Sequence, residues 1–207
     1  MLLLSVDSEK RMEIKKRDNE FLVRLPTDSW YGSRKFQSLY RFCDFTFPKL
    51  WDLHIIEPDL ADEMQPLSDM EISRGVQTAV GTRDLRKLAE NRNNAVIIVD
   101  DLSRPTPTYS VIPYVLKELE AGGIRPEKTT VIIGVGTHRP ITRSEQRRKL
   151  GSAIVDRVRV INHNCFTRQL KTFQRPNGGP DFKINRIAAD ADLKISISGI
   201  LMHGGAG

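Results

Sequence analysis

The amino-acid sequence predicts an α/β fold with a mainly parallel sheet flanked by helices. Segments 95–99 and 129–135 are nearly continuous apolar runs rich in β-branched residues, as expected of strands buried on both faces of a parallel sheet. Predicted helices over 108–121 and 142–150 follow these strands in turn. Such strand–helix alternation is typical of a Rossmann-like architecture.

Two domains are expected. Residues 1–70 are interpreted as an irregular N-terminal extension, and residues 71–207 as the α/β domain, incomplete at its C-terminus. Within the extension, segments 21–25 and 52–57 are predicted strands, and Pro58 ends the second. An acidic, proline-bearing connector then leads to the α/β domain.

Capping signals place two of the helices. Ser68 with Glu71 three residues later, and Thr142 with Glu145, both have the capping-box pattern of a helix start. Gly151 follows the predicted end of the second helix. The first capped helix is predicted to extend over 68–79. The other predicted elements are helices over 83–91 and 187–191 and strands over 158–161 and 193–198.

The composition indicates an ordinary globular protein. Of the 207 residues, 39% are hydrophobic and 28% are charged, with a formal net charge of +6. This basic balance permits anionic partners. However, the densest basic runs, 11–17 and 143–149, are interrupted by Glu and are interpreted as exposed helix faces. No nucleic-acid partner is expected, because no nucleic-acid-binding motif accompanies the charge.

The cysteines and the N-terminus indicate a cytoplasmic protein. Cys43 and Cys165 lie far apart and in no metal-ligand spacing, so we expect reduced thiols. The opening MLLLSV is too short for a signal-peptide core, and no apolar run reaches the length of a membrane span. No membrane partner is expected.

The first of three polar clusters follows the first buried strand and extends from Asp100 to Pro107. Ligands of α/β sheets gather at such strand ends. Arg104 can hold a carboxylate through two parallel hydrogen bonds, while Asp101 can hold Arg104 or accept from a sugar hydroxyl. With Thr106 as the cap and Pro107 in the first turn, the following helix start suits an anion. A capped loop with a surface Asp–Arg pair explains the cluster equally well.

The second cluster, Gly134 to Pro140, follows the second buried strand. Its glycines allow a tight turn, and His138 lies where an imidazole can act as an acid or base near neutral pH. A loop histidine bonded to a carbonyl is the alternative. The pair Gly134 and Gly136 is not a dinucleotide fingerprint, because the third glycine and the helix start are missing.

The third cluster is His203 and the glycine-rich segment up to Gly207, after the predicted strand 193–198. By itself it is a weak signal for a site. His54, inside an apolar run, is interpreted as structural, and His163 as a loop residue.

Taken together, the clusters resemble the lactate racemase family, which uses a nickel-pincer nucleotide. The motifs are Asp101-Leu-Ser-Arg-Pro-Thr-Pro107, then Gly136-Thr-His138-Arg, then His203-Gly-Gly-Ala-Gly. Arg104 and His138 are separated by 34 residues, and His138 and His203 by 65, as in the family. The resemblance covers about residues 48–207.

The resemblance implies a racemase or epimerase of 2-hydroxy acids, an isomerase. Its cofactor would be pyridinium-3,5-bisthiocarboxylic acid mononucleotide with nickel, which takes a hydride from C2 of the substrate and returns it to either face. His138 and His203 would be the acid–base pair, and Arg104 would bind the substrate carboxylate. The residues expected to border the cofactor are Asp101, Leu102, Ser103 and Arg104.

The family's anchoring lysine and nickel-binding histidine are expected beyond Gly207, so no metal ligand is assigned within this chain. We therefore expect an N-terminal portion that is inactive by itself. The run Gly199-Ile-Leu-Met before His203 departs from the usual spacing and would mark a different substrate subgroup. The implied partners are a small 2-hydroxy acid substrate and the cofactor-synthesis proteins.

Two other functions are open. The chain could be a non-catalytic α/β module of this superfamily that binds a nucleotide or a hydroxy acid. A nicotinamide-dependent oxidoreductase on the same sheet is the weaker alternative, because the dinucleotide fingerprint is missing.

Overall fold

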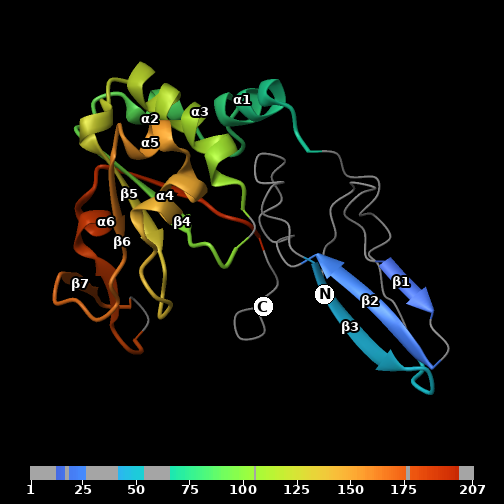
Figure 1. The fold of residues 1–207 in the computed structure, drawn as a ribbon. Helices are drawn as coiled ribbons and strands as arrows, with labels where there is room; N and C mark the ends of the chain where they lie inside the picture. The colour runs from blue at the N-terminus through green and yellow to red at the C-terminus, as the bar shows by residue number, and fades with distance from the viewer. Residues whose placement is uncertain are drawn as a thin grey trace. The chain divides into compact units, whose positions relative to one another are not determined.

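The chain divides into two compact units, Met1–Pro66 and Leu67–Gly207, seen here in a computed structural model (Figure 1). The structure describes residues 13–16, 19–26, 42–53, 66–104, 106–175 and 178–200.

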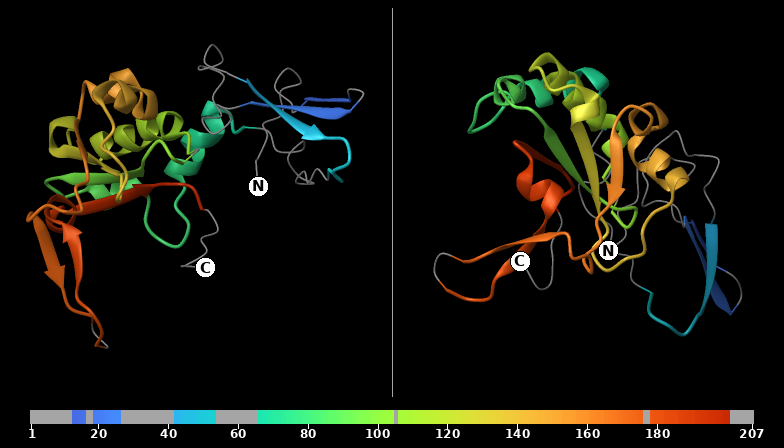
Figure 2. Two further views of the ribbon diagram at one scale, coloured as in Figure 1. Left: turned by 60° about the horizontal axis from the view of Figure 1, so that its bottom comes forward. Right: turned by 90° about the vertical axis from the view of Figure 1, so that its left-hand side faces the viewer.

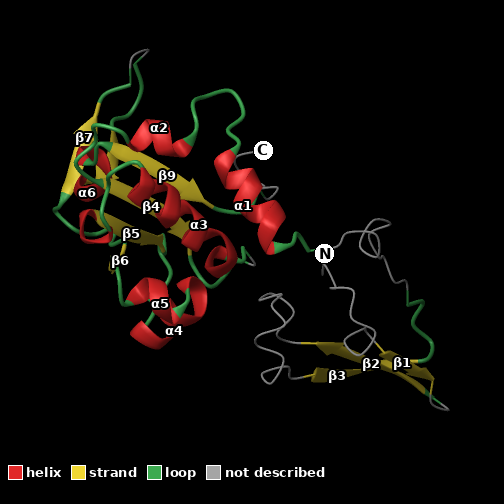
Figure 3. Cartoon of the chain, turned by 90° about the horizontal axis from the view of Figure 1, so that it is seen from above, coloured by secondary structure: helices red, strands yellow, loops and turns green. Residues whose placement is uncertain are grey.

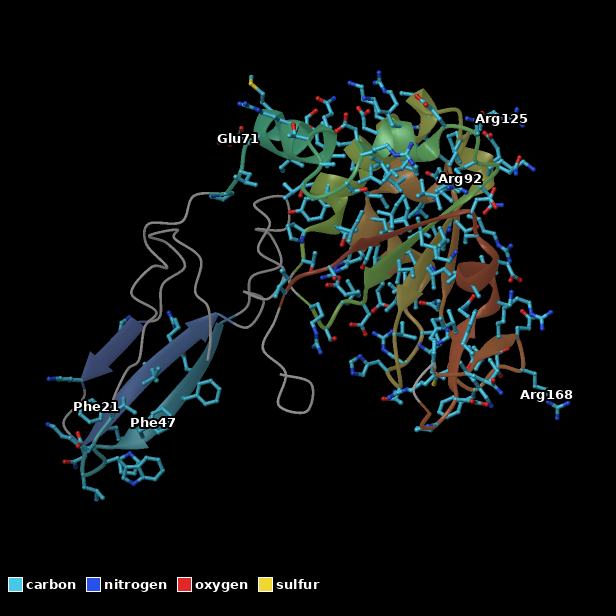
Figure 4. The ribbon with its side chains drawn as sticks, turned by 180° about the vertical axis from the view of Figure 1, so that it is seen from behind. Phe21, Phe47, Glu71, Arg92, Arg125 and Arg168 are labelled. Carbon is cyan, nitrogen blue, oxygen red and sulfur yellow. The ribbon has the colours of Figure 1, made fainter. Side chains whose placement is uncertain are left out.

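The N-terminal unit contains a three-stranded antiparallel sheet in the order β1-β2-β3. Its strands are β1 (Glu13–Lys16), β2 (Glu20–Pro26) and β3 (Phe42–Pro48). Phe21 and Phe47 lie opposite one another in the β2–β3 register (Figure 4). The strand predicted over 21–25 is confirmed as part of β2. The basic run 11–17 was wrongly interpreted as a helix face, because its described part is β1.

The second strand expected in this unit was placed too late in the chain. Asp52 and Leu53 have no regular structure, and the rest of the predicted strand 52–57 lies outside the described residues. The strand is β3 instead, in which Phe45 and Phe47 alternate with polar residues. That alternation of period two was a usable strand signal.

The second unit is built on a four-stranded sheet in the order β6-β5-β4-β9, and every neighbouring pair in it is parallel (Figure 3). The strands are β4 (Ala95–Asp100), β5 (Thr129–Gly134), β6 (Arg159–Asn162) and β9 (Leu193–Ile197). The predicted α/β fold with a parallel sheet flanked by helices is confirmed. The four predicted strands are confirmed with ends shifted by one residue.

Apolar side chains on both faces of β4 and β5 explain why these strands lie in the middle of the sheet. Ile97 and Ile133 belong to the larger core on one face, together with the helix that follows β4. Val96 and Ile132 belong to a smaller core on the other face. Burying one such side chain contributes roughly 1.5–3 kcal/mol to folding. Exposing either face of these two strands to solvent would therefore remove part of the core.

Helices cover both faces of this sheet (Figure 1). The α1 and α4 helices begin with the predicted capping boxes, at Ser68–Glu71 and Thr142–Glu145. No helix in the described part of the chain is long and apolar enough to cross a membrane. The helices are α1 (Asp69–Gln77), α2 (Leu85–Ala89), α3 (Thr108–Ala121), α4 (Arg143–Leu150), α5 (Ser152–Val155) and α6 (Arg186–Asp190), with a 3-10 turn η3 (Pro126–Lys128).

The start of α3 differs from the prediction. Pro107 is the residue that precedes the helix, and no side chain caps it. Thr106 was expected to be the cap, but its hydroxyl donates to Asp100 at the end of β4. A capping hydroxyl accepts from a backbone N–H of the helix, and the Thr106 oxygen instead accepts from the Gly199 N–H at 2.9 Å.

Between β6 and α6 the chain forms an antiparallel hairpin that the sequence did not indicate. Its strands are β7 (Leu170–Phe173) and β8 (Phe182–Asn185), and it projects away from the parallel sheet (Figure 2). Phe173 and Phe182 stack on it with ring centroids 5.5 Å apart.

The order of the strands creates a switch point at the carboxyl edge of the sheet. From β4 the chain moves to β5 and then β6 on one side, whereas β9 lies on the other side of β4. In open α/β sheets, ligands bind where strand order reverses in this way. The segments after β4, β5 and β9 therefore meet where a site is expected.

Candidate functional site

The centre of the site is a hydrogen-bonded pair of side chains from two neighbouring strand ends. Asp101 follows β4 directly, and its Oδ2 lies 2.7 Å from Nδ1 of His138, in the loop after β5. The Asp101 side chain is 8% exposed and that of His138 is 55% exposed. The imidazole can therefore meet a ligand from solvent while its partner carboxylate stays covered.

Local hydrogen bonds keep Asp101 ionised. Its Oδ1 accepts from the Ser103 backbone N–H at 3.0 Å and from the Ser103 hydroxyl at 2.5 Å. Burial acts to raise the pKa of Asp101, but the hydrogen bonds from Ser103 and His138 outweigh it and leave the pKa below its usual value. An ionised carboxylate only accepts, so the shared proton resides on Nδ1 of His138.

The His138 loop is shaped by its backbone and by the residue that follows it. Gly136 has φ +56°, a conformation that favours glycine, and the His138 N–H donates to the Val135 carbonyl at 2.8 Å. Arg139 then pairs with Glu145 of α4 through two hydrogen bonds of 2.9 and 2.6 Å. The loop is thereby attached to the first turn of α4.

Glu145 also closes the α4 capping box, and its pKa is lowered to about 2 by the hydrogen bond from Arg139 and then by that from the Thr142 backbone. Because the folded-state pKa lies below the unfolded value, this carboxylate stabilises the fold at neutral pH. That stability is lost as the pH falls from about 4.5 through about 2. We expect Glu145→Gln to lower the free energy of unfolding by about 1 kcal/mol at pH 7.

The test is urea unfolding of Glu145→Gln at pH 7 and at pH 3, with Glu127→Gln, at an exposed position in η3, as the matched control. The difference from wild type should shrink at the lower pH, because at pH 3 the unfolded wild-type chain binds a proton at Glu145 while the folded chain keeps this carboxylate ionised. An equal deficit at both pH values would contradict the assigned role.

A second ion pair lies beneath the loop after β4. Nζ of Lys149, in α4, is 2.6 Å from Oδ1 of Asp100 and donates to the carbonyls of Arg104 and Thr106 at 3.3 and 3.1 Å. The Lys149 side chain is only 3% exposed. The run 143–149 was interpreted as an exposed helix face, and for Lys149 this is wrong.

The other residues predicted in the first motif lie along the same loop. The Arg104 side chain is exposed, and its guanidinium reaches the carbonyl and the hydroxyl of Ser103 at 3.4 Å each. Leu102 is half-buried against the core below the loop. Asp101 contacts Ser103 and His138, so the suggested Asp101–Arg104 side-chain pair does not form.

Two further histidines were predicted to follow strands of the sheet, His203 as a site residue and His163 as a loop residue. His203 lies outside the described residues. His163 follows β6; its backbone N–H donates to the Ile133 carbonyl at 2.8 Å, and its Nδ1 lies 3.2 Å from Nδ2 of Asn185. These contacts agree with the loop role expected for His163.

Comparison with known protein families shows which family the chain belongs to. Residues 40–207 match the family model of the lactate racemase N-terminal domain. The chain belongs to this family. The resemblance that the three motifs indicated is thereby confirmed.

The individual relatives that the chain matches are considerably longer than the chain itself. It is 34% identical over 145 residues to the lactate racemase of Lactiplantibacillus plantarum, covering 68% of this chain and 34% of that protein. Over 138 residues it is 30% identical to the lactate racemase of Thermoanaerobacterium thermosaccharolyticum, covering 66% of this chain and 32% of that protein. The chain thus spans about a third of the length of these relatives.

A solved structure supports the same fold. The lactate racemase apoprotein of Thermoanaerobacterium thermosaccharolyticum superposes with a TM-score of 0.54 at 28% identity, covering 62% of this chain and 31% of that one.

The polar groups at the site fit part of the cofactor that this family implies. The Ser103 hydroxyl and the Asp101 carboxylate suit the hydroxyls of a ribose, and the Arg104 guanidinium suits a phosphate or a small carboxylic acid. Among the residues that the structure describes, no three His, Cys, Asp or Glu side chains gather as a metal site. The part of the cofactor that these residues could hold is the organic part.

Sequence reasoning included Asp100 in the first cluster but gave it no role, and it missed Lys149 and Gly199 as parts of this site. A signal for Lys149 was present: with Gln146 and Leu150 it lies on the i, i+3, i+4 face of α4, and all three are buried. Gly199, which follows β9, donates its backbone N–H to the Thr106 hydroxyl at 2.9 Å. No local pattern marks that contact, because 93 residues separate its partners.

Proposed function

We propose that this chain is the N-terminal portion of a racemase or epimerase of 2-hydroxy acids, with His138 and His203 as its acid–base pair. The observation that carries the proposal is the Asp101–His138 pair at the carboxyl edge of the sheet. Membership of the lactate racemase N-terminal domain family supports it independently.

Asp101 prepares His138 for proton transfer. With the proton held on Nδ1 by the carboxylate, the neutral imidazole keeps its lone pair on Nε2, where it can accept the proton of a substrate 2-hydroxyl. The resulting imidazolium is stabilised by the adjacent negative charge of Asp101. The same ring can return the proton when the hydroxyl re-forms.

Arg104 would hold the substrate carboxylate with its two parallel N–H donors, so that the hydroxyl at C2 faces His138. The nickel-pincer nucleotide, when bound, supplies the hydride acceptor for C2. Residues Asp101, Leu102, Ser103 and Arg104 would border its organic part, and the proteins that synthesise the cofactor would be partners of the native enzyme.

A racemase needs an acid or base on each side of its substrate, which is the role proposed for His203. The topology supports this assignment, because β9 is hydrogen-bonded to β4 and the segment that leads to His203 starts at the same sheet edge. Gly199 in that segment already contacts Thr106 of the loop after β4.

The proposal is tested with native protein loaded with cofactor, with loading verified by intact mass. Pure enantiomers of lactate, malate and longer 2-hydroxy acids are incubated separately and resolved by chiral chromatography. We expect at least one acid to approach an equal mixture from either enantiomer. If the loaded protein binds these acids without interconverting any, a non-catalytic binding module replaces the proposal.

A further inference from the structure

The Lys149 ammonium group is enclosed by acceptors from a single loop. It forms an ion pair with Asp100 Oδ1 at 2.6 Å, and it donates to the Thr106 carbonyl at 3.1 Å and the Arg104 carbonyl at 3.3 Å. All three belong to the end of β4 and the loop after it. Lys149 therefore binds this loop from beneath, at the position where its backbone passes Arg104.

The same cluster reaches a third segment of the chain. The other oxygen of Asp100, Oδ2, accepts from the Thr106 hydroxyl and lies 3.4 Å from the Gly199 backbone nitrogen. Gly199 also donates to Thr106. One buried ion pair thus connects α4, the loop after β4 and the segment after β9.

Helix α4 holds both loops of the site. Near its N-terminus, Glu145 binds Arg139, the residue after His138. At its C-terminal end, Lys149 binds the loop that carries Asp101 and Arg104. The loop that carries His138 and the loop that carries Arg104 are therefore both attached to one short helix, each through an ion pair.

Stability alone does not explain a lysine in this position. Removing two charges from water costs about as much as their attraction returns, so an apolar pair of similar volume would stabilise the fold equally well. What the ion pair with Asp100 and the two directed hydrogen bonds to the loop carbonyls add is one defined loop backbone. A defined backbone matters where side chains must meet a ligand with hydrogen-bond precision.

We propose that Lys149 is a positioning residue, which holds the loop after β4 in the conformation that brings Asp101 to His138 and presents Arg104 beside them. The proposal rests on the proposed function for the identity of the ligand. The loop geometry that the proposal concerns is present in the ligand-free chain, so the proposal is tested on the ligand-free chain.

The first experiment compares Lys149→Met with wild type in the ligand-free chain, and uses Lys117→Met, at an exposed position in α3, as the control. Hydrogen exchange of the backbone amides of residues 101–108 should become on the order of tenfold faster in Lys149→Met than in either reference. The imidazole ¹⁵N signature of an Nδ1-bound, hydrogen-bonded proton on His138 should be lost in parallel. If the loop amides of Lys149→Met exchange at the wild-type rate and its His138 ring keeps the wild-type ¹⁵N signal, the proposal is overturned.

A double variant separates positioning from simple charge balance. Lys149→Met leaves Asp100 buried without its counter-ion, which destabilises the whole fold; Asp100→Asn added to it removes that charge. We expect the double variant to recover the wild-type melting temperature. It should not recover the slow hydrogen exchange of the loop amides or the ¹⁵N signal of the hydrogen-bonded His138 ring. If it recovers all three, Lys149 only compensates a charge and the proposal is wrong.

The two proposals fail in distinguishable ways. Loss of loop order in Lys149→Met without any racemisation by wild type would reject the proposed reaction and retain the positioning role. If wild type does racemise 2-hydroxy acids, Lys149→Met should raise KM and lower kcat together, because both Arg104 and His138 lose their placement. Full activity of Lys149→Met would reject the positioning role alone.

Discussion

Replacing His138 by glutamine is expected to lower kcat for 2-hydroxy acid racemisation by about 10²–10⁴-fold in the native, cofactor-loaded protein. Glutamine has the size to occupy the site and can still bond Asp101. It cannot take up a proton and return it near neutral pH, which the imidazole does with the lone pair on Nε2. The substrate should still bind, because Arg104 is unchanged, so KM should move much less than kcat.

His163→Gln is the matched control for this variant. His163 also follows a strand of the sheet, but its ring lies beside Asn185 and its backbone amide is bonded to Ile133. Its replacement should change kcat by no more than about twofold, as for substitutions away from functional contacts. Equal losses in the two variants would show that His138 has no special role in proton transfer.

Replacing Arg104 by methionine should raise KM for the 2-hydroxy acid on the order of 10²-fold. Two charge-assisted hydrogen bonds to a carboxylate together contribute about 3 kcal/mol, and each 1.4 kcal/mol corresponds to a factor of ten. Methionine keeps most of the side-chain length, so the loop backbone held by Lys149 should persist. Steady-state kinetics with both enantiomers measures the effect.

Two further variants sharpen this prediction. Arg104→Lys keeps the charge but loses the two-pronged geometry, so it should recover only part of the affinity. Arg125→Met replaces an exposed arginine before β5, at the opposite end of the strand from the site, and should leave KM unchanged (Figure 4). A KM for Arg104→Met within twofold of wild type would remove Arg104 from substrate binding.

The parallel sheet could be predicted because its signals are local. Segments 95–99 and 129–135 are apolar on both faces, and the capping boxes at Ser68 and Thr142 depend on residues three positions apart. The motif spacing placed Asp101 and His138 at neighbouring strand ends. Each of these inferences needs only a short window of sequence.

What escaped prediction depends on contacts between distant segments. Asp101 had a nearby candidate partner in Arg104, yet it binds His138, 37 residues away. Lys149 lies in a basic run that looks solvent-exposed, and only the fold shows that α4 presses it against Asp100. Such pairs are set by tertiary packing, which outweighs the local tendency of a lysine to remain in water.

The most direct test of the site is a titration of the ¹⁵N-labelled chain, followed through the side-chain signals of His138 and Arg104. Lactate is compared with propionate, which has the same carboxylate but no 2-hydroxyl. We predict that both ligands shift the Arg104 signals, whereas only lactate shifts His138, because only lactate offers a hydroxyl to Nε2. Equal His138 shifts with both ligands, or none with lactate while Arg104 responds, would contradict a substrate held between this guanidinium and this imidazole.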